Sequence, residues 1–154
     1  MKAGLRSLIA PVWRWALLWV IAGGPAMVVF ARLAGMADLD AIGGEPGFFM
    51  FGTFYSLLTG LAGGILFGWT AFRTDNGRPR SRGRRVLRGA VCGAIPTALW
   101  FVAPAIRYPA TLHLYLQPDG LIFDLGYWLL FGSLAGAAGA WVTPQTLPPA
   151  GPRR

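Results

Sequence analysis

Residues 48–72 have the sequence FFMFGTFYSLLTGLAGGILFGWTAF, without one charged side chain. A helix needs about 20 consecutive apolar residues to cross the hydrocarbon core of a bilayer, and this stretch is longer than that. Lipid offers no hydrogen-bond partner to backbone N–H and C=O groups, so a segment this apolar must satisfy them internally as a helix. The alternating pattern of a membrane β-strand is not present in it. The stretch therefore predicts a transmembrane helix.

Three other stretches share this character in a chain of 154 residues, of which 55% are hydrophobic and only 13% charged. They predict further spans at about residues 8–33, 88–106 and 121–143. The chain begins like a signal peptide, but Arg14 interrupts the first apolar stretch, which is also too long, so we expect a retained helix. The expected fold is all-α: a single integral membrane domain over residues 1–154, built as a four-span transmembrane helical bundle.

Most basic residues lie on one side of these predicted spans. Arg32 and Arg107 lie on the other side, together with five of the 6 acidic residues. By the positive-inside rule, both termini and the tail 144–154 face the cytoplasm, and we expect the plasma (bacterial inner) membrane as the location. The twelve basic residues on the cytoplasmic side, out of 14, are Lys2, Arg6, Arg14, Arg73, Arg78, Arg80, Arg82, Arg84, Arg85, Arg88, Arg153 and Arg154.

The connection 73–88 is the most basic part of the chain. It contains no aromatic residue on which a base could stack, so we expect no nucleic acid partner. Attraction to anionic lipid contributes about 1 kcal/mol per basic residue near a membrane surface. The connection is therefore predicted to be a topology anchor that also contacts anionic lipid head groups. Its arginines are Arg73, Arg78, Arg80, Arg82, Arg84, Arg85 and Arg88.

Small residues recur at every fourth position of the second and fourth predicted spans. A shift of 72 residues, which also aligns Tyr55 with Tyr127 and Trp69 with Trp141, superimposes the two sets. Because a spacing of four places residues on one helix face, each set lets another helix backbone approach closely, as in a glycine zipper. The predicted helix-packing residues are Gly60, Gly64 and Gly68 in one span and Gly132, Gly136 and Ala140 in the other.

The first and third predicted spans each contain a proline near the middle, Pro25 and Pro96. A proline removes one backbone hydrogen bond, so we expect a helix kink at each. Together with the shift of 72 residues, these prolines suggest two tandem helical hairpins related by a pseudo-twofold axis along the membrane normal. The alternative is that glycine-rich apolar helices align with one another easily.

A few polar residues outside the basic connection have two interpretations each. Arg32 and Arg107 at outer helix ends are candidates for a charge pair with Asp124, or all three are capping charges that interact with helix dipoles. His113 is expected to be a solvated interfacial residue, with a pH switch as the alternative. The single cysteine, Cys92, is expected to be a small buried residue.

No ionisable residue lies deep in a predicted span, and no catalytic set, phosphate-binding loop or metal-ligand cluster can be assembled. We therefore expect neither an enzyme nor a bound cofactor or metal. The leading prediction is an accessory or scaffold subunit, whose partners are lipid, other membrane subunits or a second copy. The alternative is a small transporter or channel with two hairpin repeats, in which Trp100 lines a cavity and Thr53, Ser56 and Thr59 provide polar contacts. A lipid enzyme using His113 and the outer carboxylates is a weaker third hypothesis.

Overall fold

The computed structural model describes residues 2–35, 43–75, 81–107 and 121–143, and within them all regular structure is helical. The expectation of an all-α protein is thus confirmed. His113, the tail 144–154 and part of the basic connection lie outside the described residues. The elements are α1 (Lys2–Leu33), α2 (Gly44–Asp75), α3 (Arg82–Arg107), the π-helical segment η3 (Leu121–Leu125) and α6 (Gly126–Val142).

Three helical segments are long and apolar enough to cross a membrane: Val12–Leu33, Gly44–Ala71 and Phe123–Val142. They coincide with the first, second and fourth predicted spans, which indicates a membrane protein. α3 is not among these three segments. The helices also extend beyond the predicted spans, because α1 begins at Lys2 and α2 at Gly44.

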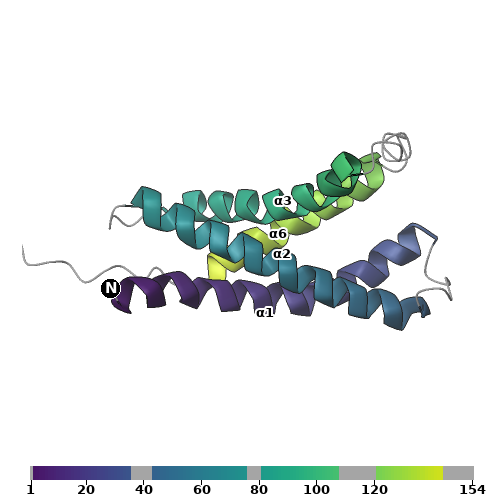
Figure 1. The fold of residues 1–154 in the computed structure, drawn as a ribbon, viewed down its shortest axis with the longest axis horizontal. Helices are drawn as coiled ribbons and strands as arrows, with labels where there is room; N and C mark the ends of the chain where they lie inside the picture. The colour runs from purple at the N-terminus through teal and green to yellow at the C-terminus, as the bar shows by residue number, and fades with distance from the viewer. Residues whose placement is uncertain (1, 36–42, 76–80, 108–120, 144–154) are drawn as a thin grey trace, which may run out of the picture.

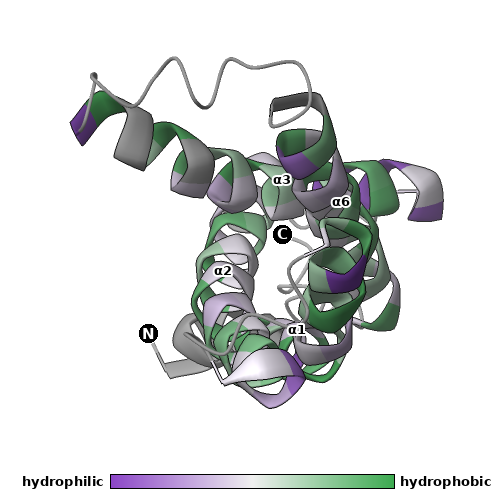
Figure 2. Ribbon diagram, turned by 90° about the vertical axis from the view of Figure 1, so that its right-hand side faces the viewer, coloured by the Kyte–Doolittle hydropathy of each residue, from purple (hydrophilic) through white to green (hydrophobic). Residues whose placement is uncertain are grey.

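The four helices form two antiparallel hairpins, α1 with α2 and α3 with α6 (Figure 1). Contacts within each hairpin are far more extensive than those of α2 with α3 or of α1 with α6. The end-on view in Figure 2 shows the helices around a common interior, with apolar residues along all of them. The hairpin is therefore the basic packing unit of this fold.

Helices approach closely within each hairpin because glycines face the partner helix. A Cβ atom on Gly60 of α2 would lie 2.7 Å from the Cβ of Trp19 in α1. In the other hairpin, a Cβ on Gly89 of α3 would lie 2.5 Å from the carbonyl oxygen of Gly136 in α6. A side chain at either position would clash, so glycine lets the backbone of α2 pack on the Trp19 side chain and the backbone of α3 pack on that of α6, as van der Waals packing between helices in lipid favours.

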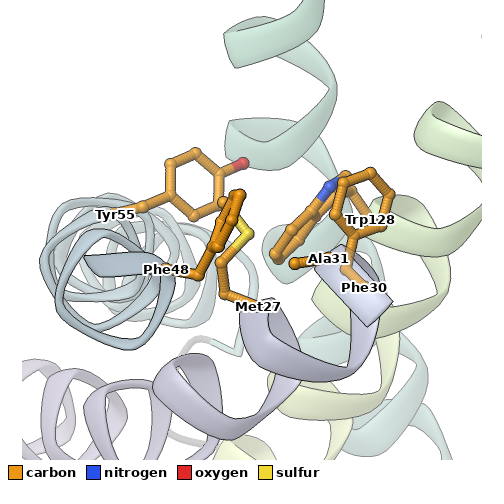
Figure 3. Packing of buried hydrophobic residues seen from close by; sticks show 6 residues of the cluster. All are labelled: Met27, Phe30, Ala31, Phe48, Tyr55 and Trp128. Carbon is orange, nitrogen blue, oxygen red and sulfur yellow. The ribbon is translucent and has the colours of Figure 1, made fainter. Parts of the chain in front are cut away.

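Large side chains fill the interior between the hairpins. Trp15, fully buried, stacks on Phe67 at 5.1 Å between ring centroids, and Cys92 and Ala140 complete this cluster with one residue from each helix. Aromatic rings bury large apolar areas and gain from such pairwise geometry. A second cluster lies further along the bundle and consists of Met27, Phe30, Ala31, Phe48, Tyr55 and Trp128 (Figure 3).

Candidate functional site

Three helix ends meet at the basic end of the bundle. Arg85, in the second turn of α3, donates from Nη2 to the carbonyl oxygen of Ala140 at 3.2 Å and to that of Thr143. Carbonyls in the last turn of a helix have no intrahelical partner, and the helix dipole favours a cation beside them. Arg88 donates to Thr74 Oγ1 at 3.0 Å, which ties the end of α2 to the same region. The start of α3 is thus level with the ends of α2 and α6.

At this end, the guanidinium group of an arginine lies over the ring of each of three tryptophans. The guanidinium carbon lies 3.4 Å from the ring centroid in the pair Arg82–Trp141 and 5.4 Å in the pair Arg73–Trp69. The third pair, Arg14 with Trp13, has a distance of 5.6 Å. All three rings are about half exposed, at 54% for Trp13, 52% for Trp69 and 53% for Trp141. Such stacking is attractive because the ring face is electron-rich.

The arginines of the basic connection therefore occupy different environments. Arg82, Arg85 and Arg88 recur at every third position of α3 and reach α6 or α2. Arg82 and Arg84 are both exposed, but the contact with a neighbouring helix is that of Arg82. Arg78 and Arg80 lie outside the described residues. The sequence placed all of these residues on one side of the membrane but did not distinguish them, because each role depends on the rotation of α3 against its neighbours. Lipid binding by these arginines stays a prediction.

The predicted helix-packing residues all lie on buried faces. Gly60 and Gly64 of α2 face Trp19 and Val12 of α1. Their counterparts in α6 face the preceding helix α3: a Cβ on Gly132 would lie 2.5 Å from Thr97 Oγ1, and Gly136 faces Gly89. Gly68 and Ala140 are buried. The glycine faces of both helices are thus covered from within the chain.

The predicted kink positions lie inside continuous helices. Pro25 is exposed within α1, and Pro96 is half-buried within α3. A bend of either helix at these residues stays a prediction.

The opposite end of the bundle carries an ion pair. Arg32 at the end of α1 and Glu45 at the start of α2 approach to 2.5 Å between Nε and Oε1. This pair was not predicted from the sequence, although opposite charges at the two adjoining ends of a hairpin are a visible signal. Asp124 lies half-buried in η3, and Arg107 is exposed at the end of α3. The pairing of Asp124 with an arginine stays a prediction.

Some polar groups in the interior are hydrogen-bonded and others are not. Thr59 Oγ1 donates to the carbonyl oxygen of Tyr55 at 2.9 Å, as threonines commonly do one turn back in a helix. Within the described part of the chain, four buried polar atoms have no hydrogen-bond partner: Trp15 Nε1, Trp19 Nε1, Tyr55 Oη and Ser56 Oγ. Trp100 lies edge-on to Tyr55, with 5.1 Å between ring centroids.

Among the described residues, no group of three histidines, cysteines or carboxylates could hold a metal ion. No known family, curated protein or solved structure matches this chain.

Proposed function

We propose that the chain crosses the membrane four times, with both termini in the cytoplasm of a bacterial cell and the bundle in the inner membrane. The support is the direction of the helices. α2 and α6 both end at the basic end of the bundle, and α3 begins there. If α2 and α6 each cross the bilayer in the same direction, the chain between them has to return across it. Residues 89–106 of α3 carry no charge and are long enough for this return.

Reporter fusions test this topology. A reporter active only in the cytoplasm should work after residue 80 and after residue 154, and should fail after residue 40 and after residue 115. A periplasmic reporter should give the opposite pattern. Activity of the cytoplasmic reporter at both 80 and 115 would show that α3 does not cross, and would overturn the four-span topology while leaving the other three helices in place.

For the molecular role, we propose a non-catalytic accessory or scaffold subunit. The observation that carries this proposal is that the interior is filled by aromatic side chains, while the outside of α2 is lined by large apolar ones. Trp19 packs edge-on to Phe131 at 5.4 Å, and Trp128 to Phe131 at 5.7 Å. On the outer face, Met50 is 72% exposed and Phe54 61%. Because the glycine faces are already covered, another subunit would pack on this outer face.

Photocrosslinking from a single position tests the scaffold role. A benzophenone amino acid at Phe54 should form a stoichiometric adduct with one defined membrane chain, or with a second copy, in intact cells. The same probe at Phe67, which is buried in the bundle, is the matched control and should react only within the chain. Adducts to lipid alone from Phe54 would count against a partner on this face.

A transporter is the second candidate, and one observation favours it. Ser56 of α2 is fully buried, and its hydroxyl has no hydrogen-bond partner in the described part of the chain. An unpartnered hydroxyl in an apolar interior is costly, and a polar solute would relieve that cost. Flux of a solute into liposomes that contain only this protein should then fall in Ser56→Ala. Equal flux in Ser56→Ala and the unaltered protein, or no flux in either, would remove this candidate.

A further inference from the structure

The three arginine–tryptophan pairs gather at one end of the bundle. The other half-exposed tryptophan of the described residues, Trp100, is 46% exposed and packs on Tyr55 instead. Stacking on a ring uses the face of the guanidinium and leaves its N–H groups in the plane, where they match the oxygens of a phosphate. An exposed tryptophan at the end of a span is typical of the level of lipid head groups. The pairs thus place N–H groups that can donate hydrogen bonds to a phosphate at the depth of the lipid head groups.

An apolar stripe leads along α6 to the best-stacked pair. Leu130 is 61% exposed, Leu134 62% and Trp141 53%, with the exposed Ala138 between the last two. These residues recur at spacings of three and four, so they lie on one helix face. An acyl chain along this stripe would bring its own head group to Arg82, which lies over Trp141.

α2 also carries an exposed apolar stripe that leads to an arginine–tryptophan pair. Leu58, Ile65 and Trp69 are 41%, 59% and 52% exposed, Ala62 between them is exposed, and Arg73 lies over the Trp69 ring. The charge of the molecule also favours an anion here, because the formal net charge is +8 and the described start of α3 carries four arginines within seven residues. Neutralising such a cluster is favourable near an anionic surface.

From these observations we infer that the Arg82–Trp141 and Arg73–Trp69 pairs are binding sites for the phosphodiester group of an anionic phospholipid. Its acyl chains lie along the apolar stripes of α6 and α2. A free phosphate would contact the guanidinium but has no acyl chain to contact the apolar stripe. We therefore propose a phospholipid as the ligand. The inference rests on the proposed membrane placement and not on the scaffold or transport role.

Native mass spectrometry of the protein in mild detergent tests this inference, with phosphatidylglycerol and phosphatidylcholine as the two probes. Unaltered protein should retain phosphatidylglycerol in preference to phosphatidylcholine. Arg82→Gln should lower the affinity for phosphatidylglycerol by about tenfold or more, because it removes charge-assisted hydrogen bonds to the phosphodiester as well as one unit of charge. Arg84→Gln, which removes the same charge two positions along the chain, is the matched control and should lower the affinity no more than about fivefold, the general effect of one basic residue near a membrane surface. Equal losses in both variants would overturn the site and leave only unspecific charge attraction.

Two further measurements show whether a negative result contradicts the lipid sites or the proposed membrane placement. Inorganic phosphate at equal concentration should not displace phosphatidylglycerol, and displacement would assign the site to free phosphate. Quenching of tryptophan fluorescence by phosphatidylcholine with brominated acyl chains reports insertion itself. No quenching would mean that the proposed membrane placement fails. Normal quenching without any preference for phosphatidylglycerol would overturn the lipid sites alone.

Discussion

Gly89 of α3 and Gly136 of α6 meet so closely that a Cβ atom on Gly89 would lie 2.5 Å from the carbonyl oxygen of Gly136. We expect Gly136→Ala to push the two helices apart, because the obstacle is backbone, which cannot rotate away. The expected cost is about 1–3 kcal/mol, as for other overpacked interiors. Reversible unfolding of the purified protein in mixed micelles measures it.

The matched control for that substitution is Gly126→Ala at the start of the same helix. A Cβ on Gly126 would have nothing within 4 Å, so this change should leave stability unchanged or raise it slightly. Equal effects of the two substitutions would show that close approach of α3 and α6 is not what Gly136 provides.

Arg85 is predicted to stabilise the end of α6. Replacing it with methionine leaves the carbonyl oxygens of Ala140 and Thr143 without this donor, so the last turn of α6 should fray. We expect a loss of about 1 kcal/mol, since water can partly replace the guanidinium at a helix end near the surface.

Hydrogen exchange locates this effect. The amide of Thr143, which donates to Gly139 O at 3.1 Å, should exchange faster in Arg85→Met. It should be unchanged in Arg84→Met, because Arg84 is exposed on α3. Faster exchange in both variants would assign the effect to total charge.

The sequence predicted the helical fold because lipid leaves an uncharged stretch no alternative to helix. It predicted helix ends less well, since hydropathy marks where lipid begins and not where backbone hydrogen bonding ends. α2 therefore starts at Gly44, four residues before Phe48, with Glu45 and Pro46 in its first turn, where a proline costs no hydrogen bond. The individual arginine roles depend on the rotation of α3 about its axis, which composition does not encode. The sequence likewise contains no signal that Trp15 is buried whereas Trp13 is exposed.

The ion pair between Arg32 and Glu45 should contribute little to stability. Both side chains are largely exposed, at 65% and 42%, and water screens such a pair. In a double-mutant cycle with Arg32→Gln and Glu45→Gln, we expect a small coupling that disappears in high salt. A large coupling that persists in high salt would show that this end is shielded from water, and would move the membrane boundary outward along α1 and α2.

The two tyrosines related by the 72-residue shift should respond differently to the loss of their hydroxyls. Tyr127 Oη donates to the carbonyl oxygen of Ala26 in α1 at 2.7 Å, and so joins the two hairpins. Tyr127→Phe should therefore cost about 1 kcal/mol, in the range of hydrogen bonds between membrane helices. Tyr55→Phe removes a buried hydroxyl that faces Thr97 but makes no hydrogen bond of good geometry within the described residues, so it should cost less than Tyr127→Phe. Unfolding in mixed micelles compares the same chemical change at both positions. If Tyr55→Phe proved as costly as Tyr127→Phe, the Tyr55 hydroxyl would be hydrogen-bonded to Thr97, to a water or to a solute inside the bundle, and only a bound solute would favour the transporter over the scaffold.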